Sequence, residues 1–186
     1  HITCLDDVLP AIEGRDEFIV ARRDWGIVVN YLVSMADTFP EVDTPEMAIR
    51  RECRGILFYP DGQIMARRLH KFFNVNERDE TQVNRIDLTR PHVILEKLDG
   101  SMVRPIPLGD GYRLATKMGI TDVAMQAEVH VATNPIYMDF ALQCIRDGFT
   151  PIFEWCSRAS RIVLDYAEDQ LVLTGIRANR DGHYMD

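Results

Sequence analysis

Two turns that contain Asp and Gly, each between apolar runs, constrain the fold of this 186-residue chain more than any other sequence feature. Pro60-Asp61-Gly62 separates residues 55–59 from 63–66, and Gly109-Asp110-Gly111 separates residues 103–108 from 112–116. Asp-Gly between apolar runs is typical of a β-hairpin, because glycine adopts the positive φ angle that a tight turn requires. The chain is therefore expected to contain at least two antiparallel strand pairs.

Further strands and helices are expected around these hairpins. Short apolar runs predict strands at 18–21, 27–33, 93–96, 151–155, 162–164 and 171–176. Asn134-Pro135 is a typical helix start and Gly148 a typical end, and a second helix is expected over 121–131. Thr3 and Asp6 have the spacing of a capping box, which predicts a short helix ending near Gly14. Hairpins with helices grouped between them indicate one α+β domain over residues 1–186, with antiparallel sheets and flanking helices.

Composition and charge exclude several classes of protein. No apolar run approaches the roughly 18–20 residues that cross a bilayer, so no membrane partner is expected. The four cysteines are far apart and form no C-x-x-C pair, which indicates free, buried thiols in a reducing, cytoplasmic compartment. The net charge of −8 does not suit a protein that coats duplex nucleic acid.

Positive charge is nevertheless concentrated in one part of the chain. Residues 50–104 hold 11 Lys and Arg against 8 Asp and Glu. A local basic segment in an acidic chain fits a pocket for a small polyanion, such as a nucleotide or one strand end. A solvated charged face is the alternative interpretation.

Lys97-Leu98-Asp99-Gly100-Ser101 is the most informative stretch for chemistry. One interpretation is a turn with a surface lysine. The other is a lysine fixed at the end of a strand, beside a glycine that lets a phosphate approach the backbone. Such an amine can attack the α-phosphate of a nucleoside triphosphate. Nearby cations would favour the free amine, and the basic segment offers candidates at Arg54, Arg67, Arg68 and Lys71.

The K-x-D-G motif resembles the signature of covalent nucleotidyltransferases, and its surroundings resemble the phage-type RNA ligase 1 family, which repairs broken tRNA anticodon loops. The resemblance covers about residues 25–186 and is carried by four blocks at 52–58, 71–77, 97–101 and 152–157, the last continuing at 161–164 and 171–177. Lys71-Phe72-Phe73-Asn74-Val75-Asn76-Glu77 is the most specific block, because capping enzymes and DNA ligases do not carry it. The resemblance implies a nucleotidyltransferase (ATP-grasp-like ligase) domain.

The resemblance also implies residue roles. Lys97 would become covalently adenylylated. Arg54 and Lys71 would contact the ribose and phosphates of the nucleotide, and Tyr31 would lie against the same nucleotide.

Three more positions follow from the same motifs. Lys117 would reach the outgoing phosphates, and Gly100 would permit close approach of a phosphate. Glu154 would bind the ribose or the water around a metal ion, and no other metal ligand is implied. The implied cofactors are ATP and Mg²⁺ (or Mn²⁺).

The resemblance implies an ATP-dependent RNA ligase that joins RNA 5′-phosphate and 3′-hydroxyl ends, in the host cytoplasm if the chain is of phage origin. Two later family motifs, an acidic E-G-x-V strand and a K-x-K pair, have no match in residues 171–186. The domain is therefore expected to be C-terminally incomplete, and this fragment to be slow or inactive. A GTP-dependent capping-type nucleotidyltransferase and a catalytically silent nucleotide- or RNA-binding module remain as alternatives.

Several residues near these motifs have structural interpretations. One of Phe72 and Phe73 is expected to face inward, because consecutive strand residues point to opposite sides. Trp155 is expected in the core, and His70, which has no obvious partner in the sequence, on the surface.

Overall fold

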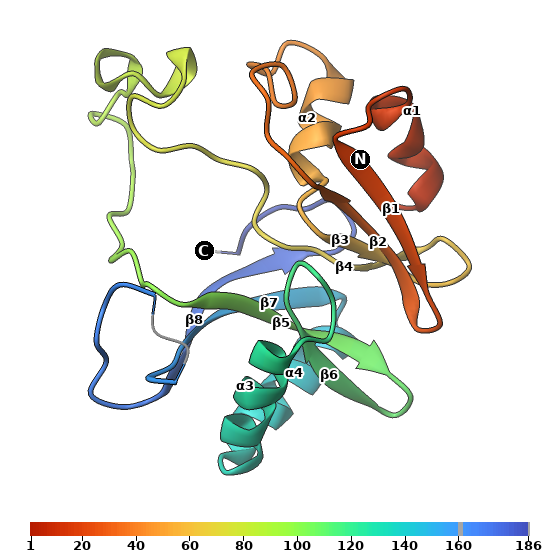
Figure 1. The fold of residues 1–186 in the computed structure, drawn as a ribbon, viewed down its shortest axis with the longest axis vertical. Helices are drawn as coiled ribbons and strands as arrows, with labels where there is room; N and C mark the ends of the chain where they lie inside the picture. The colour runs from red at the N-terminus through yellow and green to blue at the C-terminus, as the bar shows by residue number, and fades with distance from the viewer. Residues whose placement is uncertain (160–161, 186) are drawn as a thin grey trace.

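The computed structural model describes residues 1–159 and 162–185 and contains two four-stranded antiparallel sheets, one above the other in Figure 1. The first sheet has the order β1-β2-β3-β4, with β1 (Phe18–Arg23), β2 (Gly26–Tyr31), β3 (Ile56–Phe58) and β4 (Ile64–Ala66). The second has the order β6-β5-β7-β8, with β5 (Ser101–Leu108), β6 (Gly111–Ala115), β7 (Phe149–Cys156) and β8 (Gln170–Ala178). Both hairpins expected from the Asp-Gly turns, β3–β4 and β5–β6, are confirmed, and with them the α+β class.

Helices lie on the outer sides of the sheets. Beside the first sheet are α1 (Leu9–Ile12) and α2 (Pro45–Glu52), and below the second are α3 (Asp122–Ala132) and α4 (Pro135–Arg146) (Figure 1). Single 3₁₀ turns form η1 (Leu5–Asp7), η2 (Asp79–Thr81) and η3 (Val83–Arg85). The two helices expected over 121–131 and 135–148 are confirmed. Within the described residues, no helix has the length and apolar character needed to cross a membrane.

Two helix starts differ from the sequence-based expectation. At the first, Asp7 rather than Asp6 caps the turn, because Asp7 Oδ2 accepts a hydrogen bond from the Thr3 amide at 2.7 Å. Hydrogen bonds from the backbone amides of Thr3 and Cys4 lower the pKa of Asp7 to about 2. Helix α2 was not expected, although Thr44 Oγ1 accepts a bond from the Met47 amide at 3.4 Å and Pro45 occupies the first helical position.

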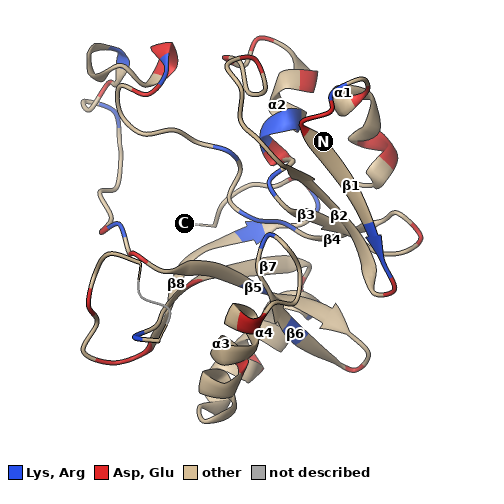
Figure 2. Cartoon of the chain, in the orientation of Figure 1, with Lys and Arg blue, Asp and Glu red and all other residues tan. Residues whose placement is uncertain are grey.

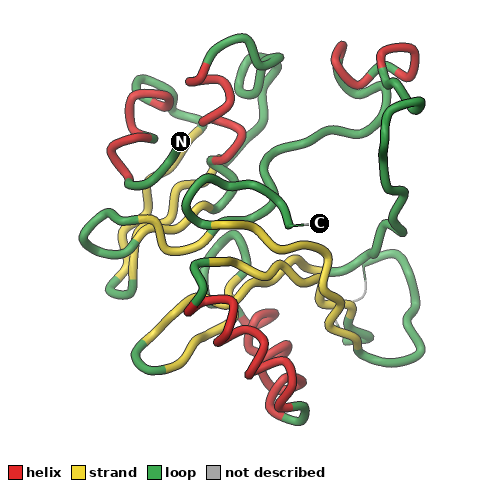
Figure 3. Tube along the Cα trace, turned by 180° about the vertical axis from the view of Figure 1, so that it is seen from behind, coloured by secondary structure: helices red, strands yellow, loops and turns green. Residues whose placement is uncertain are grey.

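The strands expected at 93–96 and 162–164 are wrong. Val93, Ile94 and Leu95 are 80%, 85% and 73% exposed, because no other segment of the described chain pairs with them. They belong to a long loop between β4 and β5 that carries η2 and η3 at its far end (Figure 3). Arg161, which belongs to one block of the sequence resemblance, lies outside the described residues.

The two sheets are joined by an apolar cluster and by one carboxylate. Leu57 and Met65 of the first sheet pack with Ile106 of the second. Beside them Glu52 accepts hydrogen bonds from Arg67 Nη1 at 3.3 Å and Arg177 Nη1 at 2.8 Å. We call the region between the two sheets, into which side chains of both sheets point, the gap.

Candidate functional site

Strand alternation directs a set of polar side chains of the second sheet toward the first. Val103 and Phe153 are paired across β5 and β7 and face α3 and α4 in an apolar cluster. Met102 and Glu154, the next pair, therefore face the opposite way, toward the first sheet, and so does Arg104. The gap between the sheets thus receives one carboxylate and one guanidinium from the second sheet.

Glu154 is the acidic group of this gap. It is partly buried, and its Oε1 accepts a hydrogen bond from the Gly100 amide at 3.1 Å. Burial raises the pKa of Glu154, and this effect exceeds the opposing effects of the Gly100 hydrogen bond and of the charges on Lys97, Arg68 and Arg54. The three cations that act on this carboxylate come from three separate parts of the sequence.

Lys97 lies on an exposed segment, and its charge acts on the Glu154 carboxylate. Two residues later, the chain is held by Asp99, whose Oδ2 accepts hydrogen bonds from the Val163 amide at 2.5 Å and the Leu164 amide at 2.8 Å. These bonds lower the pKa of Asp99, and the Asp99 amide donates to Tyr166 Oη at 2.8 Å. Among the described residues, the segment of residues 93–98, which we call the Lys97 segment, is therefore held by hydrogen bonds at its C-terminal end.

Gly100 is required by the fold itself. A Cβ atom at this position would lie 2.3 Å from the Trp155 carbonyl oxygen and 2.8 Å from the Trp155 carbonyl carbon. Real Cβ atoms do not approach backbone this closely, so β7 would have to shift for any other residue. The close passage of the chain over β7 is therefore a packing reason for this glycine that is independent of any phosphate.

Tyr31 lies between two lysines. Lys71 Nζ is 5.9 Å from the centre of the Tyr31 ring and 4.7 Å from that of Phe73, and Lys117 Nζ is 5.6 Å from that of Tyr31. Cations at these distances interact favourably with an aromatic face. The structure thus brings together three residues, Tyr31, Lys71 and Lys117, that are distant in the sequence.

Two arginines adjoin these lysines. Arg54 lies over the Phe72 ring at 5.1 Å, and Phe72 is 54% exposed. A Cβ atom at Gly55 would lie 3.1 Å from Arg68 Cδ and 3.2 Å from Lys117 Cα. We call Arg54, Arg68, Lys71 and Lys117 the cation cluster. In Figure 2, basic segments are seen at the end of α2, after β4 and at the end of β8, on the sides of the two sheets that face each other.

Two further arginines, Arg67 and Arg104, differ from the sequence-based expectation for cations near Lys97. Arg67, a candidate neighbour by sequence, is instead occupied by Glu52 and by the carbonyl oxygens of Ile2 and Asn179. Arg104, which sequence reasoning missed, lies in the gap; its signal is an arginine within the apolar run 102–108.

The burial of the aromatic residues near the motifs agrees with expectation except at His70. Phe73 is partly buried and Phe72 exposed, and Trp155 is in the core, as expected. His70 is not a surface histidine. It is half-buried, its Nδ1 lies 2.6 Å from Tyr184 Oη, and burial lowers its pKa.

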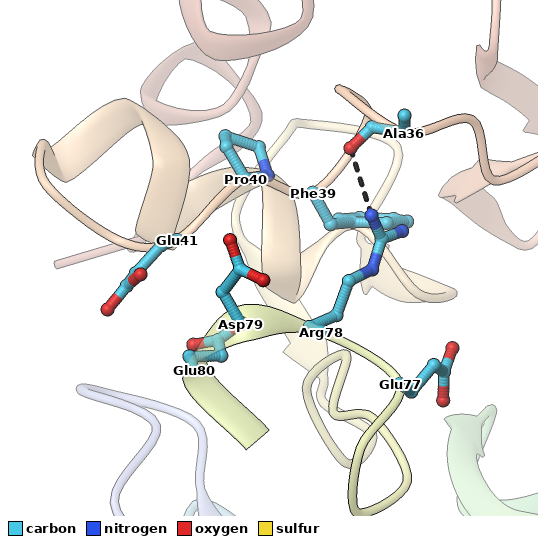
Figure 4. Close-up of a pocket in the computed structure, with 8 residues that line it drawn as sticks. All are labelled: Ala36, Phe39, Pro40, Glu41, Glu77, Arg78, Asp79 and Glu80. Atoms are coloured by element: carbon cyan, nitrogen blue, oxygen red, sulfur yellow. Dashed lines mark hydrogen bonds between the residues drawn. The ribbon is translucent and has the colours of Figure 1, made fainter. Parts of the chain in front are cut away.

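A separate pocket of about 340 Å³ lies on the far side of Phe39 (Figure 4). Its lining includes four carboxylates, of Glu41, Glu77, Asp79 and Glu80. Glu41 pairs with Arg85 and Glu80 with Arg51, while Arg78 Nη1 donates to the Ala36 carbonyl at 3.0 Å. In the described part of the chain, no group of three or more His, Cys, Asp or Glu could hold a metal ion. Phe39 connects this pocket to the candidate site, because its ring centre is 5.9 Å from Lys71 Nζ and 5.0 Å from the centre of the Tyr31 ring.

Comparison with known proteins gives a consistent result. Residues 52–186 match a family model described as RNA ligase. The chain is 33% identical over 183 residues to a putative RNA ligase of Thermovibrio ammonificans, covering 97% of this chain and 46% of that protein. It is 25% identical over 190 residues to RNA ligase 1 of bacteriophage TS2126, covering 97% of this chain and 47% of that protein. The chain spans about half the length of the curated relatives it matches.

Proposed function

The chain belongs to the RNA ligase family, and on that premise we propose that it carries the nucleotide-binding part of an ATP-dependent ligase in which Lys97 accepts AMP. One observation supports this most strongly. An exposed lysine, Lys97, and two arginines, Arg54 and Arg68, act electrostatically on the partly buried carboxylate of Glu154. Such an arrangement suits a phosphate-bearing substrate that reacts with the lysine.

The first step is phosphoryl transfer to nitrogen. Lys97 Nζ, as the free amine, attacks the α-phosphorus of ATP. A nitrogen–phosphorus bond forms, the bond to the bridging oxygen breaks, and pyrophosphate leaves with that electron pair while the amine loses a proton to solvent. Lys71 and Lys117 offset negative charge on the phosphates, and this positioning and charge neutralisation account for most of the catalysis of such reactions.

Magnesium fits the site as an ion carried mainly by the substrate. Glu154 is the carboxylate that acts together with Lys97, and the described residues offer no cage of acidic side chains. Mg²⁺ (or Mn²⁺) is commonly held by one carboxylate, phosphate oxygens and water. Glu154 would hold this ion through water, and the ion would neutralise charge on the phosphates.

The later steps use RNA ends. AMP moves from Lys97 to an RNA 5′-phosphate, and a 3′-hydroxyl then displaces AMP and seals the strand. Phe72 is 54% exposed and lies beside Arg54, which suits stacking of an unpaired base next to a backbone phosphate. We therefore propose single-stranded RNA ends, such as those of a broken tRNA anticodon loop, as the substrates.

Covalent labelling tests the proposal. The protein is incubated with Mg²⁺ and either α-labelled ATP or α-labelled GTP, denatured and separated on a gel. Label from ATP alone is the expected result. Label from GTP alone would support a capping-type enzyme instead, and no label from either would support a silent binding module.

A further inference from the structure

Two buried arginines in the gap between the sheets, Arg68 and Arg104, have few hydrogen-bond partners in the fold. Arg68 is 7% exposed and Arg104 is 1% exposed. Within residues 1–159 and 162–185, Nε and Nη1 of both side chains have no hydrogen-bond partner. Burying a charged group without partners is costly, so these arginines call for a reason other than packing.

The two side chains meet at Gly55. Arg104 Nη2 donates to the Gly55 carbonyl oxygen from the second sheet. Arg68 Cδ lies against the same glycine from the chain after β4. Arg54, the preceding residue, also has an Nη1 atom with no partner among the described residues. Three guanidinium groups with unpartnered nitrogen atoms therefore surround one short stretch of backbone.

These arginines act on one another electrostatically. Burial and the nearby charge of Arg54 together lower the pKa of Arg68 to about 10, although Glu154 opposes the effect. Burial also lowers the pKa of Arg104 well below its usual range, with Arg68 contributing. The positive potential of the gap is therefore concentrated around Arg68.

Arg67, which precedes Arg68, has the hydrogen-bond partners that are typical of a buried structural arginine. Arg67 is 2% exposed, yet it donates to the Asn179 carbonyl at 3.0 Å, the Ile2 carbonyl at 2.7 Å and Glu52 at 3.3 Å. Arg68, one residue later and almost as buried, has no comparable set of partners among the described residues. The contrast favours a role for Arg68 in ligand binding over a purely structural role.

We propose that Arg68 is a further phosphate-binding residue of this gap, next to Arg54, for which the family resemblance already implies a phosphate contact, and that Arg104 adds positive charge from behind Gly55. The bound phosphate supplies the negative charge that the fold lacks there, so binding stabilises the protein. A guanidinium presents parallel N–H donors that match two phosphate oxygens, which suits this role. The ligand class rests on the proposed function, in which two phosphates are candidates: the triphosphate of the nucleotide and the 5′-phosphate of an RNA end.

Thermal unfolding of the 186-residue chain tests the proposal with three probes. These are sodium tripolyphosphate and one short RNA prepared with either a 5′-phosphate or a 5′-hydroxyl. Tripolyphosphate, or the 5′-phosphate RNA more than its 5′-hydroxyl form, is expected to raise the melting temperature of the wild type. Which of the two responses depends on Arg68 identifies the source of the phosphate.

Arg68→Met is the decisive variant. Loss of the charged donors is expected to weaken the effective probe about 10- to 100-fold. Without a probe, Arg68→Met is expected to be at least as stable as the wild type, because it replaces an unpartnered buried charge with an apolar side chain. A merely structural arginine would give the opposite pattern, with lower stability and an unchanged probe response.

Arg113→Gln is the matched control for net charge. Arg113 is partly exposed and pairs with Glu128 at 2.8 Å, so its loss is expected to leave the probe response unchanged. Where Arg68→Met does not fold, Arg68→Gln takes its place with the same expected loss. Wild-type probe affinity in the Arg68 variant, or no response of the wild type to any probe, would overturn the phosphate site.

Failure of this site and failure of the ligase proposal are distinguishable. A protein that forms no lysyl-AMP but shows an Arg68-dependent phosphate response would refute the ligase proposal alone. A protein that forms lysyl-AMP, and whose responses to tripolyphosphate and to 5′-phosphate RNA are both unchanged by Arg68→Met, would refute the phosphate site alone.

Discussion

The cation cluster and the Lys97 segment face the same gap but are held in different ways. In the cluster, Arg68 lies two residues after the end of β4 and is buried, and Lys71 lies against the Phe73 ring. In the Lys97 segment, Val93 and Ile94 are 80% and 85% exposed, and no strand forms. The difference suggests that ligand binding is preorganised by the sheets, whereas placement of the nucleophile depends on a few contacts of one loop.

The largest expected effect separates binding from reaction. Lys97→Ala is expected to abolish covalent AMP and to leave ATP binding within about twofold, because the cation cluster is intact. Lys97→Arg is expected to fail equally, since a guanidinium stays protonated and cannot attack. Labelling on a denaturing gel and calorimetric ATP binding measure the two properties. Loss of ATP binding together with the label would contradict the separation.

The next effect concerns the anchor of the Lys97 segment. Asp99→Ala removes the acceptor of the Val163 and Leu164 amide hydrogen bonds. Loss of this anchor is expected to slow adenylylation about tenfold or more, because small displacements of a reacting group are costly, with ATP affinity unchanged. An adenylylation time course measures the rate.

Asp87→Ala is the matched control for this variant. Asp87 lies in the same long loop, and within the described part of the chain its carboxylate bonds to Thr89 alone. Its rate is expected to equal that of the wild type. Equal slowing of both variants would mean that the loop as a whole, and not the Asp99 anchor, sets the rate.

A stability effect is expected at Gly100. Gly100→Ala places a Cβ atom 2.3 Å from the Trp155 carbonyl oxygen, so β7 must move, which is expected to lower the free energy of unfolding by about 1–3 kcal/mol. Gly111→Ala is the control, because a Cβ atom there meets nothing within 4 Å and the backbone is not in the left-handed region. Chemical denaturation compares the two. Similar losses in both variants would show that the close approach to Trp155 is not the cause.

The smallest effect is a pH dependence at Glu154. Burial raises the pKa of Glu154, so the folded state disfavours its ionised form. Below the unfolded-state pKa the carboxyl is protonated in both states; as the pH rises through the folded-state pKa, the wild type loses stability. Glu154→Gln keeps the oxygen that accepts from Gly100 and has no charge to ionise. Its stability relative to the wild type is therefore expected to increase from pH 4 to pH 7, and a constant difference in melting temperature would contradict this.

The sequence predicted local structure well where turn and cap residues specify it. The Asp61-Gly62 and Asp110-Gly111 turns gave both hairpins, and Asn134-Pro135 gave α4, because these signals act within a few residues. Val93 to Leu95 predicted a strand that did not form, since a strand requires a partner that a local pattern does not supply.

The site could be predicted only in part for a similar reason. Glu154, Arg54 and Lys97 were named from motifs, and in the structure the charges of Arg54 and Lys97 both act on Glu154. Arg104 was missed because only the pairing of β5 with β7 shows which way it faces. The contact of Gly55 with Lys117 joins positions far apart in the chain, and no local pattern indicates it.

The central claim is that Lys97 is the residue that accepts AMP, and the chain allows a direct measurement. It contains three lysines, Lys71, Lys97 and Lys117, and all three lie at the gap. The protein is incubated with ATP and Mg²⁺ and digested under conditions that preserve the phosphoramidate bond. Its lysine-containing peptides are then examined by mass spectrometry. The account predicts one AMP adduct, on the peptide that contains Lys97. An adduct on the peptide of Lys71 or Lys117, with the Lys97 peptide unmodified, would contradict it.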